Sequence, residues 1–168
     1  MITPGWVAAM STYNAEMNRR WYSAASRLTD AQRREDRGVF FKSLHGTLSH
    51  LIWTDRVWMN RFDGWERPPG AIKDSPFYVQ DFEEMRALRE RQDSDIAAWA
   101  GRVTQEWIDA DLTWLSGATG RTMTMPTAIL LMHFFNHQTH HRGQAHAMIT
   151  AAGEKTGDTD LPFILPFD

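Results

Sequence analysis

Four long stretches of this sequence repeat their apolar residues at steps of three and four, the spacing of one face of an α-helix. The clearest is the segment 41–62, FKSLHGTLSHLIWTDRVWMNRF. Its continuous apolar stripe consists of Leu44, Leu48, Leu51, Trp58 and Phe62. Such a stripe is stable when it packs against another element. Four such segments in 168 residues predict an all-α four-helix bundle formed by a single domain, 1–168.

The other three helices are predicted at 4–28, 80–103 and 126–153. Thr3 and Pro4 open the first as a capping hydroxyl followed by proline at the first helical position, and Pro126 opens the last. The charged run EEMRALRERQDSD in the third is expected to form a solvated outer face. The side chains expected to face inward are Val7, Met10, Tyr13, Met17 and Trp21 in the first helix and Phe82, Met85, Leu88, Ile96 and Trp99 in the third.

The segments between these helices differ in character. After a cap at Thr29, AQRRED is expected to form a polar helical turn. The connection 63–79 is long for two antiparallel neighbours, so it is expected to carry the chain from one end of the bundle to the other. The segment DLTWLSGATGRTMTM alternates polar and apolar residues on either side of a stretch that contains glycine. This pattern predicts a short hairpin before the last helix. The tail GDTDLPFILPFD is too rich in proline for a helix, but apolar enough to pack on the body.

Composition excludes several kinds of site. The chain has no cysteine, so a metal would be held by nitrogen and oxygen ligands, and a reacting thiol would come from outside. A net charge of −3 gives no electrostatic case for nucleic acid or an anionic membrane. We find neither a membrane-spanning apolar run nor an export signal and therefore expect a cytoplasmic protein. The eight tryptophans and nine phenylalanines are expected to fill the core and would permit a homodimer interface.

Five of the seven histidines fall in the segment 133–148, HFFNHQTHHRGQAHAM. On a helical wheel drawn at about 100° per residue, His137 and His141 lie on either side of the line through the apolar residues Leu130 and Met148. They are one helical turn apart, which lets two rings converge on one ion. The alternative is a hydrogen-bonded pair of core histidines, but the large apolar neighbours offer few acceptors.

The remaining histidines are less central. His133 and His140 lie on one flank of the same stripe and are expected at the rim of a site. His146 faces away and is expected at the surface or in an interface. In the helix predicted at 41–62, His45 and His50 lie on opposite sides of the centre of the apolar stripe. Periodicity therefore does not indicate which of the two faces a site.

The segments SLHGTLSHLIWTDRVWMNRF and HFFNHQTHHRGQAHAM, together with DTDLP, closely resemble the DinB-like superfamily. That group contains the damage-inducible DinB proteins, the bacillithiol-dependent S-transferases and the mycothiol-dependent maleylpyruvate isomerases. The motif NHxxHHRGQ is specific, and a histidine followed five residues later by an acidic residue supports it. The resemblance implies a four-helix bundle with up-down-down-up topology.

The resemblance also implies a divalent metal held by one histidine of the second helix and two of the last. These ligands fall on His50, His137 and His141. Gln144 completes the last-helix motif and, like Asp55, His133 and His140, is a candidate to contact the ligands. An exposed ion pair is the alternative for Asp55. Within the same motif, Gly143 is expected to allow close helix approach and Arg142 to brace a carboxylate or backbone carbonyls.

Three neutral imidazoles leave at least one coordination position open. Zinc and nickel suit nitrogen ligands, and three histidines do not exclude iron or manganese. In the thiol-transferase relatives the metal binds a low-molecular-weight thiol, whose thiolate attacks a small-molecule electrophile or isomerises a double bond. We therefore predict a metal-dependent transferase of this type. The alternative is a metal-binding, stress-associated bundle protein without catalysis; a DNA-binding function finds no support in the charge pattern.

Overall fold

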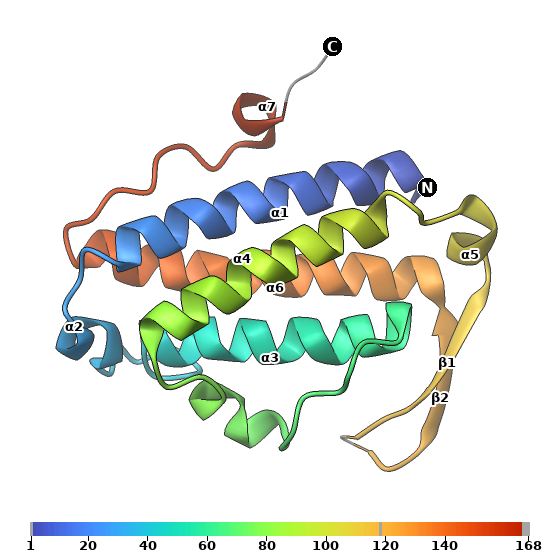
Figure 1. Cartoon of the computed structure of the whole chain (residues 1–168), viewed down its shortest axis with the longest axis horizontal. Coiled ribbons are helices and arrows are strands. Elements are labelled where there is room, and N and C mark those ends of the chain that lie inside the picture. The colour runs from blue at the N-terminus through green and yellow to red at the C-terminus, as the bar shows by residue number, and fades with distance from the viewer. Residues whose placement is uncertain (1, 118, 166–168) are drawn as a thin grey trace.

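The computed structural model describes residues 2–117 and 119–165, and within them four long helices pack side by side (Figure 1). These helices are α1 (Pro4–Ala25), α3 (Leu44–Asp63), α4 (Phe82–Ala100) and α6 (Thr127–Ala151). In Figure 1, α1 and α6 run in one direction, whereas α3 and α4 run in the other. The predicted four-helix bundle and its up-down-down-up order are therefore confirmed.

The parallel arrangement of α3 and α4 requires the long connection between them. Gly64 ends α3 in a left-handed conformation with φ of 70°. The chain then returns along the outside of α3 and forms a 3-10 helix, η1 (Ile72–Phe77), which the sequence analysis did not predict. The Ser49 hydroxyl donates to the backbone oxygen of Ser75 at 2.8 Å and accepts from the amide of Val79 at 3.0 Å. These bonds fix the connection against the first half of α3.

Shorter elements close the two ends of the bundle. The predicted polar turn is α2 (Asp30–Arg34), capped by Thr29. The predicted hairpin is present as β1 (Asp111–Leu115) and β2 (Thr122–Pro126), with Thr113 opposite Thr124. The short helix α5 (Gln105–Asp109) precedes it and was not predicted.

The tail departs from its prediction in one respect. It contains a single helical turn, α7 (Leu161–Ile164), although we expected no helix. Pro162 stands near the start of this turn, where proline is tolerated because the first amides of a helix need no partner. The described part of the tail does pack on the body as expected, since the Tyr13 hydroxyl donates to the carbonyl of Thr159 at 2.6 Å.

Several predicted helix boundaries are also corrected. The third helix spans Phe82–Ala100 rather than 80–103. The second helix starts at Leu44 rather than Phe41, because Lys42 has a positive φ of 68° and Ser43 caps the amide of Gly46. The first helix ends at Ala25, three residues early. Pro126 belongs to β2 and precedes the last helix, instead of forming its first residue.

The core follows the predicted stripes closely. All five apolar residues chosen in α3 are buried, as are four of the five in α1 and four of the five in α4. Met10 and Leu88 are half-buried. At the end where α1 begins, the ring of Phe62 stacks on Trp99 at 5.7 Å and meets Phe134 edge-on at 5.6 Å. Many of the aromatic residues thus fill the core, as expected, whereas Phe40, Phe77 and Phe163 are exposed.

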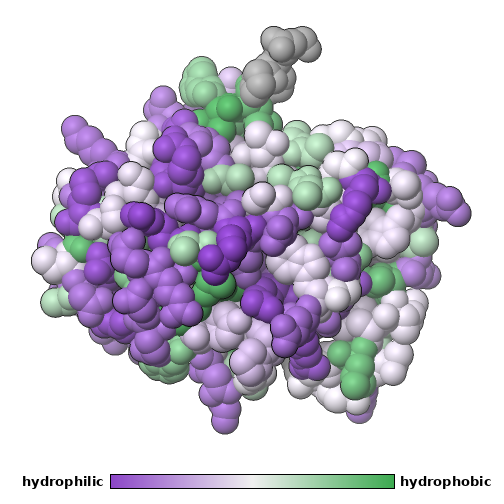
Figure 2. Space-filling view, viewed as in Figure 1, coloured by the Kyte–Doolittle hydropathy of each residue, from purple (hydrophilic) through white to green (hydrophobic). Residues whose placement is uncertain are grey.

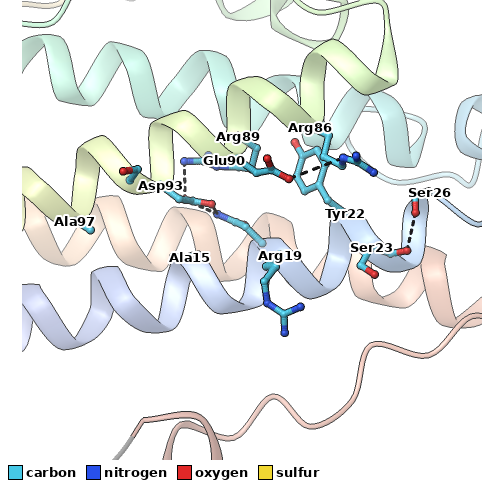
Figure 3. Close-up of a pocket in the computed structure, with 12 residues that line it drawn as sticks. Ala15, Arg19, Tyr22, Ser23, Ser26, Arg86, Arg89, Glu90, Asp93 and Ala97 are labelled. Carbon is cyan, nitrogen blue, oxygen red and sulfur yellow. Dashed lines mark hydrogen bonds and ion pairs between the residues drawn. The ribbon is translucent and has the colours of Figure 1, made fainter.

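The charged run of α4 is not wholly a solvated face, which corrects the prediction. Arg89 and Asp93 are 3% and 8% exposed and project from α4 towards α1 (Figure 3). Arg89 bonds Asp55 of α3 at 2.6 Å and Asp93 at 2.8 Å, and Asn18 of α1 donates to Asp93. A helix packed between two neighbours buries its flanks as well as its centre, so charges there are stabilised by partners on those neighbours.

The face of the molecule shown in Figure 2 is mainly hydrophilic over α1 and α4. Leu115 of the hairpin and Phe163 of α7 are 65% and 74% exposed and are exceptions to this polar character. Within the described residues, no helix combines the length and hydrophobicity needed to cross a membrane.

Candidate metal centre

Three histidines from α3 and α6 meet in one cluster. The candidate ligand atoms of His50, His137 and His141 all lie within 4.8 Å of one another. The Nε2 atoms of His50 and His137 are 3.3 Å apart. His50 and His141 are buried and His137 is half-buried, so the cluster lies just beneath the surface between the two helices. The structure therefore brings together the three residues predicted as ligands, and their role as ligands stays a prediction.

One pair of nitrogens in the cluster has the spacing of two ligands on the same metal ion. Zinc binds imidazole nitrogen at about 2.0–2.1 Å, so two such ligands at tetrahedral angles lie about 3.3 Å apart. The separation of the Nε2 atoms of His50 and His137 is the same, 3.3 Å. The donor set contains no sulfur and no carboxylate, so an ion bound by these three residues would be held by imidazole nitrogen alone.

The hydroxyl of Ser75 on η1 orients His50. The Ser75 hydroxyl donates to the carbonyl of Ile72 at 2.6 Å, so its oxygen is free to accept from Nδ1–H of His50 at 2.8 Å. This bond leaves Nε2 of His50 with the lone pair that faces the cluster. Ser75 was not predicted from the sequence, because a single serine in an irregular connection carries no periodic signal.

The amide of Gln144 does the same for His141. Nδ1–H of His141 donates to the Gln144 side-chain oxygen at 2.8 Å, which leaves Nε2 of His141 available as a ligand. The amide nitrogen of Gln144 contacts Nε2 of His140 at 3.3 Å. The structure thus places Gln144 against a predicted ligand, and its effect on a bound metal stays a prediction.

The environment keeps the three imidazoles neutral. Burial, reinforced by the neighbouring histidines, lowers the pKa of His50 to about 2 and that of His137 to about 3. Burial also lowers the pKa of His141, although its bond to Gln144 opposes the shift. Neutral imidazole is the form that binds a metal, so at neutral pH no proton has to be removed first.

Phe41 covers one side of the cluster. Its ring stacks on His50 with centroids 3.8 Å apart and planes at 26°, and it lies 5.3 Å from the ring of His141. Phe41 was predicted to start a helix and was not predicted to contact the site. Its actual position depends on the turn that precedes α3, which periodicity does not describe.

The other residues expected near the site lie at different distances from it. His133 and His140 are exposed, and their rings lie 5.7 Å from His137 and 4.9 Å from His141. Both stand at the edge of the cluster. His146 packs on Trp21 at 5.3 Å and is half-buried.

Asp55 lies in the ion pair with Arg89 described above and has no hydrogen bond to a histidine among the described residues. The pair is buried, with side chains 1% and 3% exposed, so the exposed ion pair expected as an alternative is wrong. The carboxylate faces α4 because α3 packs against α4 on the flank that carries Asp55.

Two expectations for the last-helix motif are corrected. A Cβ at Gly143 would meet no heavy atom within 4 Å, so this glycine does not mediate close helix approach. Arg142 is buried, and its side chain donates to the hydroxyl of Thr139 at 3.4 Å; among the described residues it bonds no carboxylate or carbonyl. Its guanidinium lies 5.7 Å from the ring of Tyr13. Arg142 therefore helps to join α6 to α1.

Comparison with known proteins supports the fold. No curated protein sequence matches the chain. A crystal structure of a DinB-like protein from Bacillus cereus ATCC 10987 matches 84% of this chain and 89% of its own, with a TM-score of 0.61 and 21% identity. YfiT from Bacillus subtilis matches 92% of each chain, with a TM-score of 0.64 and 15% identity, and is described as a probable metal-dependent hydrolase with an unusual four-helix bundle topology.

At these identities, the structural matches establish the fold alone. The model of the DinB family, in contrast, matches residues 1–166, which is nearly the whole sequence. The chain that brings His50, His137 and His141 together therefore belongs to the DinB family.

Proposed function

We propose that this protein binds a divalent metal ion through His50, His137 and His141 and uses it as a metal-dependent transferase. The observation that carries the proposal is the orientation of the imidazoles. Ser75 and Gln144 accept from Nδ1–H of His50 and His141, which leaves the Nε2 lone pairs available to a metal. The hydroxyl oxygen of Thr54 lies 3.2 Å from Nε2 of His50 and is the nearest competitor for that lone pair. Three protein ligands leave a coordination position open, which is typical of catalytic rather than structural sites.

The chemistry follows from that open position. A bound dication would lower the pKa of a thiol or water molecule held there and make it a nucleophile at neutral pH. Because the protein has no cysteine, the thiol would be a low-molecular-weight thiol from solution, and no protein thiolate would compete with it. Phe41 shields the face of His50 from water, which strengthens electrostatic interactions within the site.

Hydrolysis is the second candidate, supported by the description of YfiT as a probable metal-dependent hydrolase. The same open position would then hold water instead of a thiol. A third possibility is a metal that only ties α3 to α6, without catalysis. All three functions require the metal, whereas a hydrogen-bonded cluster of core histidines does not.

Metal content tests the common requirement. We expect one equivalent of zinc or nickel in the natively purified protein and almost none in His137→Ala, measured by elemental analysis, with unchanged far-UV circular dichroism. His146→Ala is the matched control, because His146 is on the same helix but packs against Trp21. Full metal retention in His137→Ala would overturn the site.

Activity assays on the metal-loaded protein separate the candidates. We expect conjugation of a small thiol such as cysteine to an aryl halide, and its loss in His137→Ala. Hydrolysis of a nitrophenyl ester without conjugation would favour the second candidate. Absence of both activities in a protein with full metal content would favour the non-catalytic one.

A further inference from the structure

A cavity of about 570 Å³ lies next to the metal centre. It is bounded by the turn 39–42, the first turn of α3 and the helix η1. Phe41 lines it and also stacks on His50, so one aromatic ring separates the cavity from the histidine cluster. Its volume is in the range of pockets that hold small organic molecules.

Large apolar side chains surround the cavity. Phe40, Ile72 and Phe77 line it and are 76%, 58% and 69% exposed. They come from two segments that are about thirty residues apart in the sequence but meet here. Large apolar side chains gathered on the surface are typical of binding sites, because their exposure to water is unfavourable.

The charge of the cavity is positive. Lys42 and Lys73 line it, are exposed, and form no ion pair within the described residues. They are two of the three lysines in the sequence. The third basic residue of the lining, Arg34, is already paired with Asp30 at 2.8 Å. Among the described residues, no acidic side chain lines the cavity.

His45 adds a hydrogen-bond acceptor to the wall. It lines the cavity and is 2% exposed. Its Nε2–H donates to the carbonyl of Val79 at 2.9 Å, which leaves a lone pair on Nδ1. This Nδ1 atom is buried and has no partner within the described residues. A buried acceptor without a partner is costly, and a ligand that donates a hydrogen bond would satisfy it.

We propose that this cavity binds an amphipathic organic anion and anchors it as part of the acceptor substrate, whose reactive end extends past the ring of Phe41 to the metal centre. The apolar body packs against Phe40, Ile72 and Phe77, and the anionic group lies between the two lysines. A hydroxyl or amide of the ligand donates to His45. The role as a substrate site rests on the proposed function, whereas binding of the anion does not.

Calorimetric titration of the metal-stripped protein tests the charge preference. The probes are 4-(4-hydroxyphenyl)butanoate and its primary amide, which share an apolar body and a hydroxyl. We expect the carboxylate to bind about threefold to tenfold more tightly than the amide, since each exposed charge pair contributes less than about 1 kcal/mol. Equal affinity for the two probes would overturn the proposal.

Variants locate the binding. In Lys42→Gln/Lys73→Gln the preference for the carboxylate should disappear, while Lys155→Gln, which changes the remaining lysine, should retain it. Lys42→Gly provides a second check. It removes the charge but relaxes the positive φ of 68°, so the variant should be at least as stable as the parent while binding the carboxylate less well. Unchanged binding in both lysine variants would contradict the assignment.

The same titration on His137→Ala separates this inference from the proposed function. We expect this variant to bind the carboxylate as the parent does, because the cavity lies beyond Phe41. If the parent protein binds the carboxylate saturably but contains no metal when natively purified, the anion site is supported and the metal-dependent function is rejected. Metal binding without a saturable carboxylate titration would reject the inference alone. The inference would also be rejected if the protein binds neither probe and forms a dimer that the substitution Phe40→Ser dissociates.

Discussion

At the scale of single residues, the hydrogen bonds made by the histidine rings determine which of their nitrogen atoms face the candidate metal centre. His137 and His141 share a helix, so a fixed angle per residue places both on the inner face. His45 and His50 are both buried, at 2% and 1% exposure, and periodicity could not choose between them. The connection after α3 gives the two histidines different partners: His45 bonds the carbonyl of Val79, whereas His50 bonds the hydroxyl of Ser75.

The orienting role of Gln144 is testable by substitution. In Gln144→Ala, His141 loses the acceptor of its Nδ1–H, and we expect metal affinity to fall by about tenfold to a hundredfold. Alanine is a good helix former at this half-buried position, so thermal stability of the metal-free protein should change little. Competition with a chromophoric chelator measures the affinity.

Thr150→Ala is the control for that experiment, because Thr150 is on the same helix and bonds only backbone carbonyls of its own turn. It should bind metal as the parent does. If Gln144→Ala also binds metal with parental affinity, its amide does not orient His141 in the bound state.

At the scale of elements, the start of α3 positions both the metal centre and the cavity. Ser43 caps the helix, and the preceding turn places Phe41 over His50. Gly46 permits this packing, because a Cβ there would lie 2.6 Å from the carbonyl oxygen of Phe41 and 3.3 Å from Pro76. A close approach that requires glycine is therefore found at Gly46 in α3, against the turn and η1, and not at Gly143 in α6, where we expected one.

These two glycines predict opposite effects of the same substitution. Gly46→Ala should lower the free energy of unfolding by about 1–3 kcal/mol, because the clash is with backbone and the turn must move. Gly143→Ala meets nothing within 4 Å and should raise it by up to about 1 kcal/mol, the helix preference of alanine over glycine. Urea denaturation of the metal-free variants measures both. A stabilised Gly46→Ala would show that the turn is not held in this position.

Across the whole molecule, one buried charge cluster joins three of the four long helices. Asn18 of α1, Asp55 of α3, and Arg89 and Asp93 of α4 contact one another away from solvent. Two carboxylates share one arginine. Burial raises the pKa of Asp93 to about 6, and the charge of Asp55 adds to the shift, whereas Arg89 and Asn18 oppose it.

This shift predicts a pH dependence of folding. The unfolded chain releases the proton of Asp93 at about pH 3.9, before the folded protein does at about 6, so this residue favours folding most below pH 4. Its contribution is lost as the pH rises from about 4 to 6, by up to about 3 kcal/mol. Asp93→Asn should remove this loss from the pH profile of the metal-stripped protein, measured by urea unfolding.

The buried histidines give the opposite slope, because their lowered pKa values favour folding as the pH rises. They are present in both proteins and cancel in the comparison. Asp95→Asn, at an exposed position of the same helix, should leave the profile unchanged. An identical profile for Asp93→Asn and the parent would show that Asp93 is ionised throughout this range.

The sequence by itself determined the four long helices, their buried stripes and the inward position of His137 and His141. These are local properties, because helix formation, capping and periodic burial depend on residues within a few turns of one another. The resemblance to a known family supplied the order of the helices and the choice of His50.

Only the tertiary structure decided which groups from distant segments meet. The contact of Ser75 with His50, the position of Phe41 and the buried pairing of Arg89 with Asp55 all join residues of different elements. Their partners are fixed by the path of an irregular connection and by the packing of helices. Neither leaves a periodic pattern in the sequence, because the energy that selects these contacts arises only when the elements are assembled.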